Sequence, residues 1–382
     1  MPSPAADDAF GAGLYAALRA PGNLVMSPVS IALALRLALL GARGDTAAEL
    51  AAALRLAGPE QAAEDLRVLS ARLDGLAGGP VTLRAPATLW VQAGLPLQPG
   101  YTAALAGLVS VSVHDADFAR AAEAAREEIN ALIAAQTSGK ITGLLAPHTV
   151  NAATRAVLAS AIYLKAAWAR PFPAGATADG PFHPEPGRTV DGPLMHLAAR
   201  LRYRRGDGYQ VVELPYADGP LAMLIVLPDG GLGPVEERLA AGGVAGLAGG
   251  SGTGPDGLGP RPVRLALPKF RVTSVLDLRA ALTALGAGRM FRDDADFSGL
   301  TQAMPLHVSA VAHKAYLDVD EQGTEAAAAT AVVARPMARI ATGEPPVELV
   351  VDRPFLYAIT DTGSGRPLFL GRVTDPTAGL AA

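Results

Sequence analysis

Residues suited to chemistry are sparse in this 382-residue chain, and their spacing arranges none of them into a familiar site. There is no cysteine, so thiol catalysis, disulfides and cysteine-bound metal are excluded. The six histidines are scattered, with no HExxH pair and no two at a helical spacing that would align them as ligands. We therefore expect no metal site.

Nucleophilic and acid–base chemistry have no better support. No Gly-x-Ser-x-Gly elbow precedes an expected helix, so a Ser-His-Asp hydrolase has no anchor. The carboxylate pairs Glu127–Glu128 and Asp293–Asp294 are adjacent in sequence, so their side chains point apart and favour solvated surface. An enzyme stays an alternative, but no residue pattern supports it.

One stretch formally matches a dinucleotide-binding loop. Residues Gly252 to Gly257 read GTGPDG, which fits GxGxxG, but such a site needs a strand before it and a helix after it. Here Pro260 and Pro262 follow, and the motif lies in a glycine-rich stretch from Gly242 to Pro260. We interpret this stretch as a flexible surface loop and expect no cofactor.

Composition narrows the class of partner. The net charge is −4 and the basic residues form no dense run, so neither nucleic acid nor a membrane surface is expected. The apolar run Val29 to Leu40 is interrupted by Arg36 and is too short to span a bilayer, which favours a buried helix. The first residues are acidic where a secretory signal is basic. We expect a cytoplasmic monomer with a protein or small-molecule partner; an extracellular place stays open if the start is trimmed or export is unconventional.

The segment from Glu321 to Ile340, EQGTEAAAATAVVARPMARI, has the most unusual composition. Alanine favours a helix, but Val332, Val333 and Pro336 do not. Read as a strand, it has an uncharged face and a face that carries both charges. The uncharged face holds Thr324, Ala326, Ala328, Thr330, Val332 and Ala334, and the other holds Glu325, Ala327, Ala329, Ala331, Val333 and Arg335. Such a strand could enter a sheet with its uncharged side inward.

The order of elements favours an α+β fold, because helices dominate the first third and strands the remainder. Ser27 and Pro28 begin a helix that ends at Gly41, Thr46 to Glu49 form a capping box that begins a second, and a third runs from Arg120 to Thr137. The expected strands are 81–83, 87–91, 109–113, 156–164, 210–214, 221–227, 263–267, 308–317, 347–351, 355–359 and 368–373.

Several stretches, taken in order, resemble the serpin family of serine protease inhibitors over nearly the whole chain. They are NLVMSPVSIALAL from Asn23, INALIAAQTSGKITGLL from Ile129, SAIYLKAAWARPF from Ser160, VVELPY and LIVLPD in the middle, LALPKFRV from Leu265, FSGLT from Phe297, VAHKAYLDVDEQGTEAAAATA from Val311, and DRPFLYAITDTGSGRPLFLGRVTDP from Asp352.

The resemblance implies one domain over residues 1–382, with three β-sheets, eight or nine helices and an exposed reactive-centre loop at about 321–346. The implied hinge of this loop comprises Glu321, Gly323, Thr324, Glu325, Ala326, Ala327, Ala328, Ala329 and Thr330. Counting sixteen residues from Glu321, as the family does, gives Met337 and Ala338 as the bond that a protease attacks.

The implied activity is suicide inhibition of a serine protease through a covalent acyl complex, followed by insertion of the cut loop into the central sheet. Met337 suits elastase-, chymotrypsin- or subtilisin-like enzymes, whereas cleavage at Arg335 or Arg339 would make the target trypsin-like. The small residues of the hinge would not obstruct insertion. A serpin-fold binding protein that does not inhibit is the alternative.

The resemblance also implies two groups that control opening of the sheet. Ser27, Ser30 and His313 match the family's shutter region, with Ser160 at a position where asparagine is usual, and Trp168 matches the residue at the top where the loop enters. Each has a purely structural alternative: Ser27 is at least a helix cap, and Trp168 and His313 could be packed residues with satisfied polar atoms.

Overall fold

The computed structural model describes residues 4–77, 81–249, 257–325 and 344–380. Within these residues it has eight α-helices and two β-sheets, an α+β architecture as the sequence predicts. The helices are α1 Pro4–Leu18, α2 Pro28–Gly41, α3 Gly44–Leu54, α4 Pro59–Leu76, α5 Pro99–Leu105, α6 Phe118–Gln136, α7 Leu232–Ala248 and α8 Arg279–Ala284.

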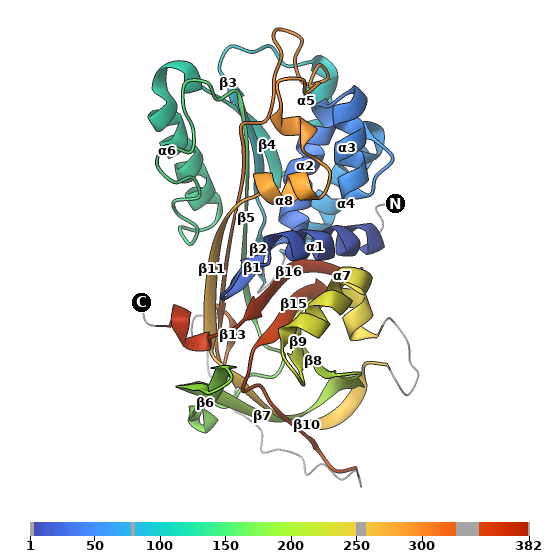
Figure 1. The fold of residues 1–382 in the computed structure, drawn as a ribbon, viewed down its shortest axis with the longest axis vertical. Helices are drawn as coiled ribbons and strands as arrows, with labels where there is room; N and C mark the ends of the chain where they lie inside the picture. Colours follow the sequence, from blue (N-terminus) through green and yellow to red (C-terminus); the bar gives the residue numbers. More distant parts are fainter. Residues whose placement is uncertain (1–3, 78–80, 250–256, 326–343, 381–382) are drawn as a thin grey trace.

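The central sheet has seven strands and runs the length of the molecule (Figure 1). Its strands are β2 Thr82–Arg84, β3 Ala87–Gln92, β4 Val111–Ala116, β5 Ala156–Ala167, β11 Phe270–Asp277, β12 Ala310–Val319 and β13 Gly323–Thr324. The main order is β11-β12-β13-β5-β3-β4, and β2 pairs with the upper end of β5. Helix α6 covers one face, and α2 packs against the other.

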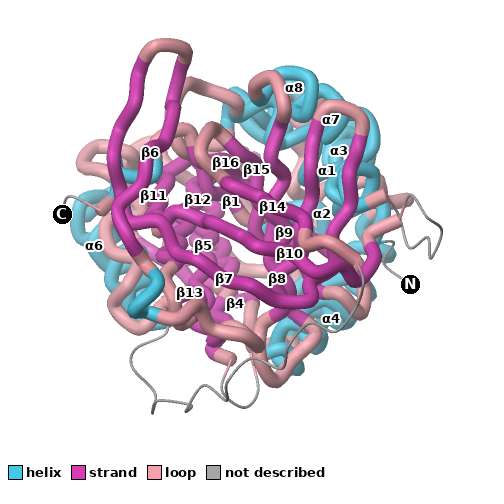
Figure 2. Tube along the Cα trace, turned by 90° about the horizontal axis from the view of Figure 1, so that it is seen from below, coloured by secondary structure: helices cyan, strands magenta, loops and turns pink. Residues whose placement is uncertain are grey.

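The second sheet has nine strands. They are β1 Leu24–Met26, β6 Ala178–Glu185, β7 Arg188–Gly206, β8 Tyr209–Pro215, β9 Leu221–Pro228, β10 Gly259–Pro268, β14 Val347–Val350, β15 Phe355–Asp361 and β16 Arg366–Val373. In Figure 2, β6, β7 and β10 lie side by side across one end of the molecule. The 19-residue β7 also pairs with β8, so pairing is continuous from the end layer to the buried strands.

Helix α2 confirms the helix expected after Ser27. The Ser27 side chain accepts a hydrogen bond from the Ser30 N–H at 3.1 Å, Pro28 occupies the first turn, and the helix ends at Gly41. Every α2 residue except Leu40 is buried. The helix therefore lies in the core between the two sheets, with its first turn beneath β5 and β12.

The capping box at Thr46 is wrong. Helix α3 begins at Gly44, so Thr46 already lies inside it, and its Oγ1 accepts a hydrogen bond from the Asp296 N–H at 2.9 Å. The threonine therefore serves a distant loop and does not cap its own helix. A short-range pattern could not show this tertiary partner.

The glycine-rich stretch is also partly misread, because α7 continues through Gly242 to Ala248. The reason is distant: the Asp8 carboxylate accepts hydrogen bonds from the Val244 and Ala245 N–H groups at 2.8 and 3.0 Å and restarts the helix after a kink at Gly243. Gly243 has φ +66° and a Cβ there would lie 2.3 Å from Asp8 Oδ2, so only glycine fits. The GxGxxG residues 252–256 lie outside the described residues.

All eleven expected strands correspond to observed ones, although β4 begins at Val111 and not at Val109. The sequence does not predict β1, β6, β7, β11 or β13. Strand β7 is the largest omission, because Gly192 and Pro193 interrupt its pattern and its exposed positions are arginines. Its pairing on both sides holds it extended in spite of the weak local signal.

Arg36, which interrupts the apolar pattern of α2, is itself buried at 1% exposure. Its Nη2 lies 2.7 Å from Asp7 Oδ1 and 3.5 Å from Asp65 Oδ2, and Asp7 also binds Arg366 at 2.7 Å. Burial raises the pKa of Asp65 although Arg36 opposes the shift. This four-charge cluster joins α1, α2, α4 and β16 in the core.

Removing one member of the cluster should be costly. We expect Arg36→Met to lower the free energy of unfolding by about 3 kcal/mol, because it leaves Asp65 buried without its cation. Adding Asp65→Leu should recover most of the loss. Denaturant titration measures both; Arg67→Met in the exposed Arg67–Glu64 pair of α4 is the control and should cost less than about 1 kcal/mol. A double variant no more stable than Arg36→Met would contradict the pairing argument.

Candidate functional site

The site lies where β5 and β12 meet in the central sheet. The two strands run parallel and pair directly over six residues, from Val157 opposite Ala310 to Ile162 opposite Ala315. Above these pairs the strands separate, and β13 lies between them. The same two strands are thus closed at one end and open at the other.

Strand β13 consists of Gly323 and Thr324, the start of the expected hinge. Thr324 pairs antiparallel with Val319 of β12 and with Ala166 of β5, and Gly323 pairs with Ala167. A Cβ at Gly323 would lie 2.1 Å from Ala166 O, so the approach of the two backbones requires glycine. The hinge therefore occupies the sheet by two residues in the uncut chain.

Thr324 is fully buried and its hydroxyl is satisfied. Its Oγ1 lies 2.6 Å from the hydroxyl of Tyr216, which stacks on Trp168 with ring centroids 4.5 Å apart. Trp168 in turn donates from Nε1 to Asp320 O and from its backbone N–H to Gln322 O. Burial raises the pKa of Tyr216, so its hydroxyl keeps its proton. These contacts place Trp168 and Tyr216 directly against the hinge.

Glu321 anchors the turn that precedes β13. Its carboxylate accepts from Thr177 Oγ1 at 2.7 Å and pairs with Lys269 Nζ at 2.6 Å, while its carbonyl accepts from the Phe172 N–H. Burial opposes ionisation, but the Lys269 and Thr177 hydrogen bonds prevail and lower the pKa of Glu321. The start of the hinge is thereby tied to β11 and to the segment after β5.

His313 lies beneath the directly paired part of β5 and β12. Its Nε2 accepts from the Ser27 N–H at 3.1 Å, and its Nδ1 lies 2.9 Å from Ser160 Oγ. Because Nε2 is an acceptor, a neutral ring carries its proton on Nδ1 and donates to Ser160. Ser30 adds a hydrogen bond from Oγ to Ala161 O at 2.9 Å. The four side chains are fully buried and link both strands to the start of α2.

The structure brings Ser27, Ser30, Ser160 and His313 together, and Ser160 makes the contact for which asparagine is usual in the resemblance. Glu321, Gly323, Thr324 and Glu325 lie at the upper end of the same two strands, beside Trp168. Ala326, Ala327, Ala328, Ala329, Thr330, Arg335, Met337, Ala338 and Arg339 lie outside the described residues.

Sequence reasoning did not assign roles to Tyr216, Lys269, Thr177 or Lys140, all of which contact the described hinge. Three of the four lie in stretches that carry the resemblance, VVELPY, LALPKFRV and INALIAAQTSGKITGLL. Those stretches were the available signal. Nothing local showed that they converge on Glu321, Thr324 and Glu325.

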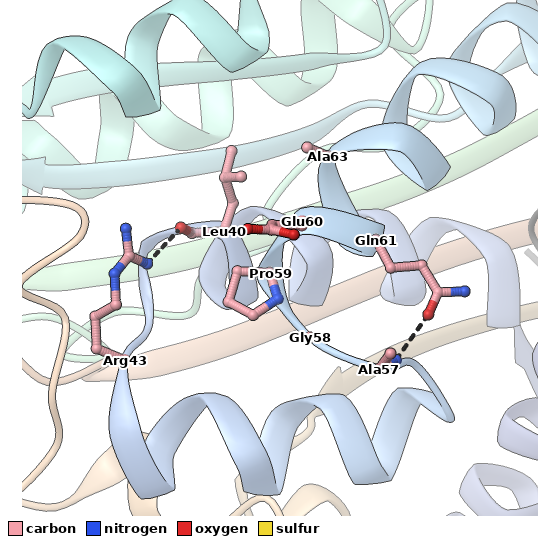
Figure 3. Close-up of a pocket in the computed structure, with 8 residues that line it drawn as sticks. All are labelled: Leu40, Arg43, Ala57, Gly58, Pro59, Glu60, Gln61 and Ala63. Atoms are coloured by element: carbon pink, nitrogen blue, oxygen red, sulfur yellow. Dashed lines mark hydrogen bonds between the residues drawn. The ribbon is translucent and has the colours of Figure 1, made fainter.

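Other features offer less chemistry. A surface hollow of about 700 Å³ lies between the end of α2 and the start of α4, and Figure 3 shows Arg43 and Gln61 in its lining already bonded to Leu40 O and to the Ala57 N–H. In the described part of the chain, no helix is long and apolar enough to cross a membrane. The same residues contain no group of three or more histidines and carboxylates placed to hold a metal ion.

Burial of His313 makes stability depend on pH. Burial lowers the pKa of His313 from 6.5 to about 3, so between these values the unfolded chain takes up a proton that the folded protein excludes. This contribution is complete above pH 6.5 and is lost as pH falls. We expect His313→Gln to reduce the loss of unfolding free energy on acidification by up to about 1.4 kcal/mol per pH unit.

Denaturant titrations from pH 7 to pH 4 measure this slope. His196→Gln on the exposed side of β7 is the control and should keep the wild-type profile. Parallel profiles for His313→Gln and the wild type would show that His313 is not excluded from protonation.

Comparisons with known proteins agree with this geometry. The family model for "Serpin (serine protease inhibitor)" matches residues 5–376. A leukocyte elastase inhibitor of Bos taurus is 36% identical, over 97% of this chain and 99% of that protein.

Two solved structures are also similar. Serpin48 of the insect Tenebrio molitor is 30% identical with a TM-score of 0.84 and covers 97% of both chains. Human thyroxine-binding globulin in complex with its hormone is 28% identical with a TM-score of 0.83 and covers 98% of both chains. This chain belongs to the serpin family.

Proposed function

We propose that the protein inhibits serine proteases by a suicide-substrate mechanism in which the cut loop inserts between β5 and β12. The observation that carries the proposal is that Gly323 and Thr324 already lie between these strands. The hinge of the uncut chain thus has the position and direction that a longer inserted strand requires. The similar leukocyte elastase inhibitor supports an inhibitory role.

The lengths of the elements support full insertion. Thr324 pairs antiparallel with Ala166, so each further loop residue steps one residue back along β5, and Ala334 would lie opposite Ala156, the first residue of that strand. The even-numbered loop residues would then alternate with the core-facing side chains of β5. These are the small, uncharged residues that the sequence places on one face, so burial would cost little.

The same register gives Thr330 a partner. It would lie opposite Ser160 on β5 and His313 on β12, which now contact each other. An entering strand must break that contact, since it separates the two residues. A threonine hydroxyl both donates and accepts, so at this position it can satisfy Ser160 and His313 after they part.

Insertion can stop a protease mechanically. The protease serine attacks the carbonyl of the cleaved bond and forms an acyl ester, and the strand then carries the tethered enzyme on the order of 40 Å along the sheet. A triad and oxyanion hole fail under far smaller displacements. Each new backbone hydrogen bond contributes about 1 kcal/mol net, and a full strand makes many of them.

We place the attacked bond at Met337–Ala338, within a reactive-centre loop of about 321–346 in a single domain. An unbranched apolar residue fits elastase-, chymotrypsin- or subtilisin-like pockets. Arg335 and Arg339 are the competing positions and would select trypsin-like enzymes. The rival function is ligand binding without inhibition, since the similar thyroxine-binding globulin was solved with its hormone; an unobstructed hinge favours inhibition.

Thr324→Arg separates the two functions. A buried arginine opposite Ala166 should block strand entry, so the variant should be cut and released by an elastase- or subtilisin-like protease, while the wild type forms a covalent band of summed mass on a denaturing gel. Thr324→Ser, which keeps the hydroxyl near Tyr216, is the matched control and should still form the band. Absence of the band for the wild type with every protease class would contradict inhibition.

Mass spectrometry of the peptide released with the complex locates the bond. We expect a fragment that begins at Ala338. A fragment that begins at Pro336 or Ile340 would move the site to Arg335 or Arg339 and change the target class to trypsin-like.

A further inference from the structure

Glu325, the last described residue before the masked part of the loop, contacts a segment far from it in sequence. Its Oε1 forms an ion pair with Lys140 Nζ, which lies four residues beyond the end of α6. The Glu325 side chain is 14% exposed, and its Oε2 is buried without a hydrogen-bond partner among the described residues. Burial, followed by the Glu325 charge, raises the pKa of Tyr163 below it. The carboxylate is therefore held against the sheet face and does not extend into solvent.

The backbone of Glu325 ends strand β13. Its φ is +47°, in the left-handed region that non-glycine residues rarely adopt, while its N–H donates to Asp318 O at 2.9 Å. A chain in this conformation cannot continue as a strand. Growth of β13 requires Glu325 to return to extended backbone, and its side chain is tied to Lys140.

The segment that carries Lys140 is itself fixed. Thr142 O accepts a hydrogen bond from Lys314 Nζ of β12 at 2.6 Å, and Leu145 is bonded to Asn130 of α6 through its N–H and its carbonyl. Ile141 and Leu144 are buried between α6 and the sheet. Lys140 thus extends from an anchored support over the point where β13 stops.

We propose that Lys140 is a positioning residue for loop insertion: its ion pair with Glu325 holds Gly323 and Thr324 in the sheet and stops the strand at that depth in the uncut protein. The second half of this statement rests on the proposed function, because it concerns insertion after cleavage. A hinge held at the gap starts insertion without first having to find it. Lys140 therefore favours trapping over release of the cut inhibitor.

Hydrogen–deuterium exchange tests the holding role on the free protein. In Lys140→Gln, the Glu325 N–H, bonded to Asp318 O, and the Asp320 N–H, bonded to Gly323 O, should exchange about two- to fivefold faster, as expected for loss of a half-exposed ion pair. The exchanged pair Lys140→Glu with Glu325→Lys should return to within about twofold of the wild type. Arg67→Gln, in an exposed ion pair of α4, is the control. Unchanged exchange in Lys140→Gln would overturn the proposal.

The ratio of covalent complex to cut, released inhibitor tests the role in insertion. We expect the released fraction of Lys140→Gln to rise about two- to fivefold, with recovery in the exchanged pair and no change in Arg67→Gln. Faster exchange with an unchanged ratio would overturn the positioning role. A wild type that forms no complex with any protease would instead refute the proposed function, and the exchange experiment would still decide whether Lys140 holds the hinge.

Discussion

The space between β5 and β12 is the constraint on which the rest of the molecule depends. Over six residue pairs the two strands satisfy each other's backbone groups, and above them Gly323 and Thr324 satisfy both strands instead. Buried backbone donors and acceptors cannot be left unpaired without a large cost. The sheet can therefore be closed or filled by another strand, but it cannot stand open.

Polar groups in the core follow the same rule. The neutral His313 ring uses both nitrogens, one toward Ser27 on α2 and one toward Ser160 on β5, so separation of the strands also disturbs the start of the buried helix. At the upper end, Tyr216 satisfies the buried Thr324 hydroxyl, and Lys269 and Lys140 pair with Glu321 and Glu325 on either side of it. The two ends of the same strand pair are thus stabilised by separate sets of contacts.

Features encoded locally could be predicted from the sequence. The Ser27 cap, the α2 helix and the alternation that begins at Thr324 depend on residues within a few positions of one another, and the ordered motifs identify the fold. The capping box at Thr46 and the loop at Gly242–Ala248 were wrong because Asp296 and Asp8, distant in sequence, decide those conformations. Tyr216 and Lys140 could not be assigned, since their contacts with the hinge exist only after the chain has folded.

The central claim is that the uncut protein is held short of its most stable arrangement and that cutting the loop lets a strand fill the space between β5 and β12. Thermal unfolding of the intact and the loop-cleaved protein tests it most directly. Because a full inserted strand adds many hydrogen bonds of about 1 kcal/mol each, the cleaved form should melt higher by about 10 °C or more. Equal or lower melting of the cleaved form would contradict the account.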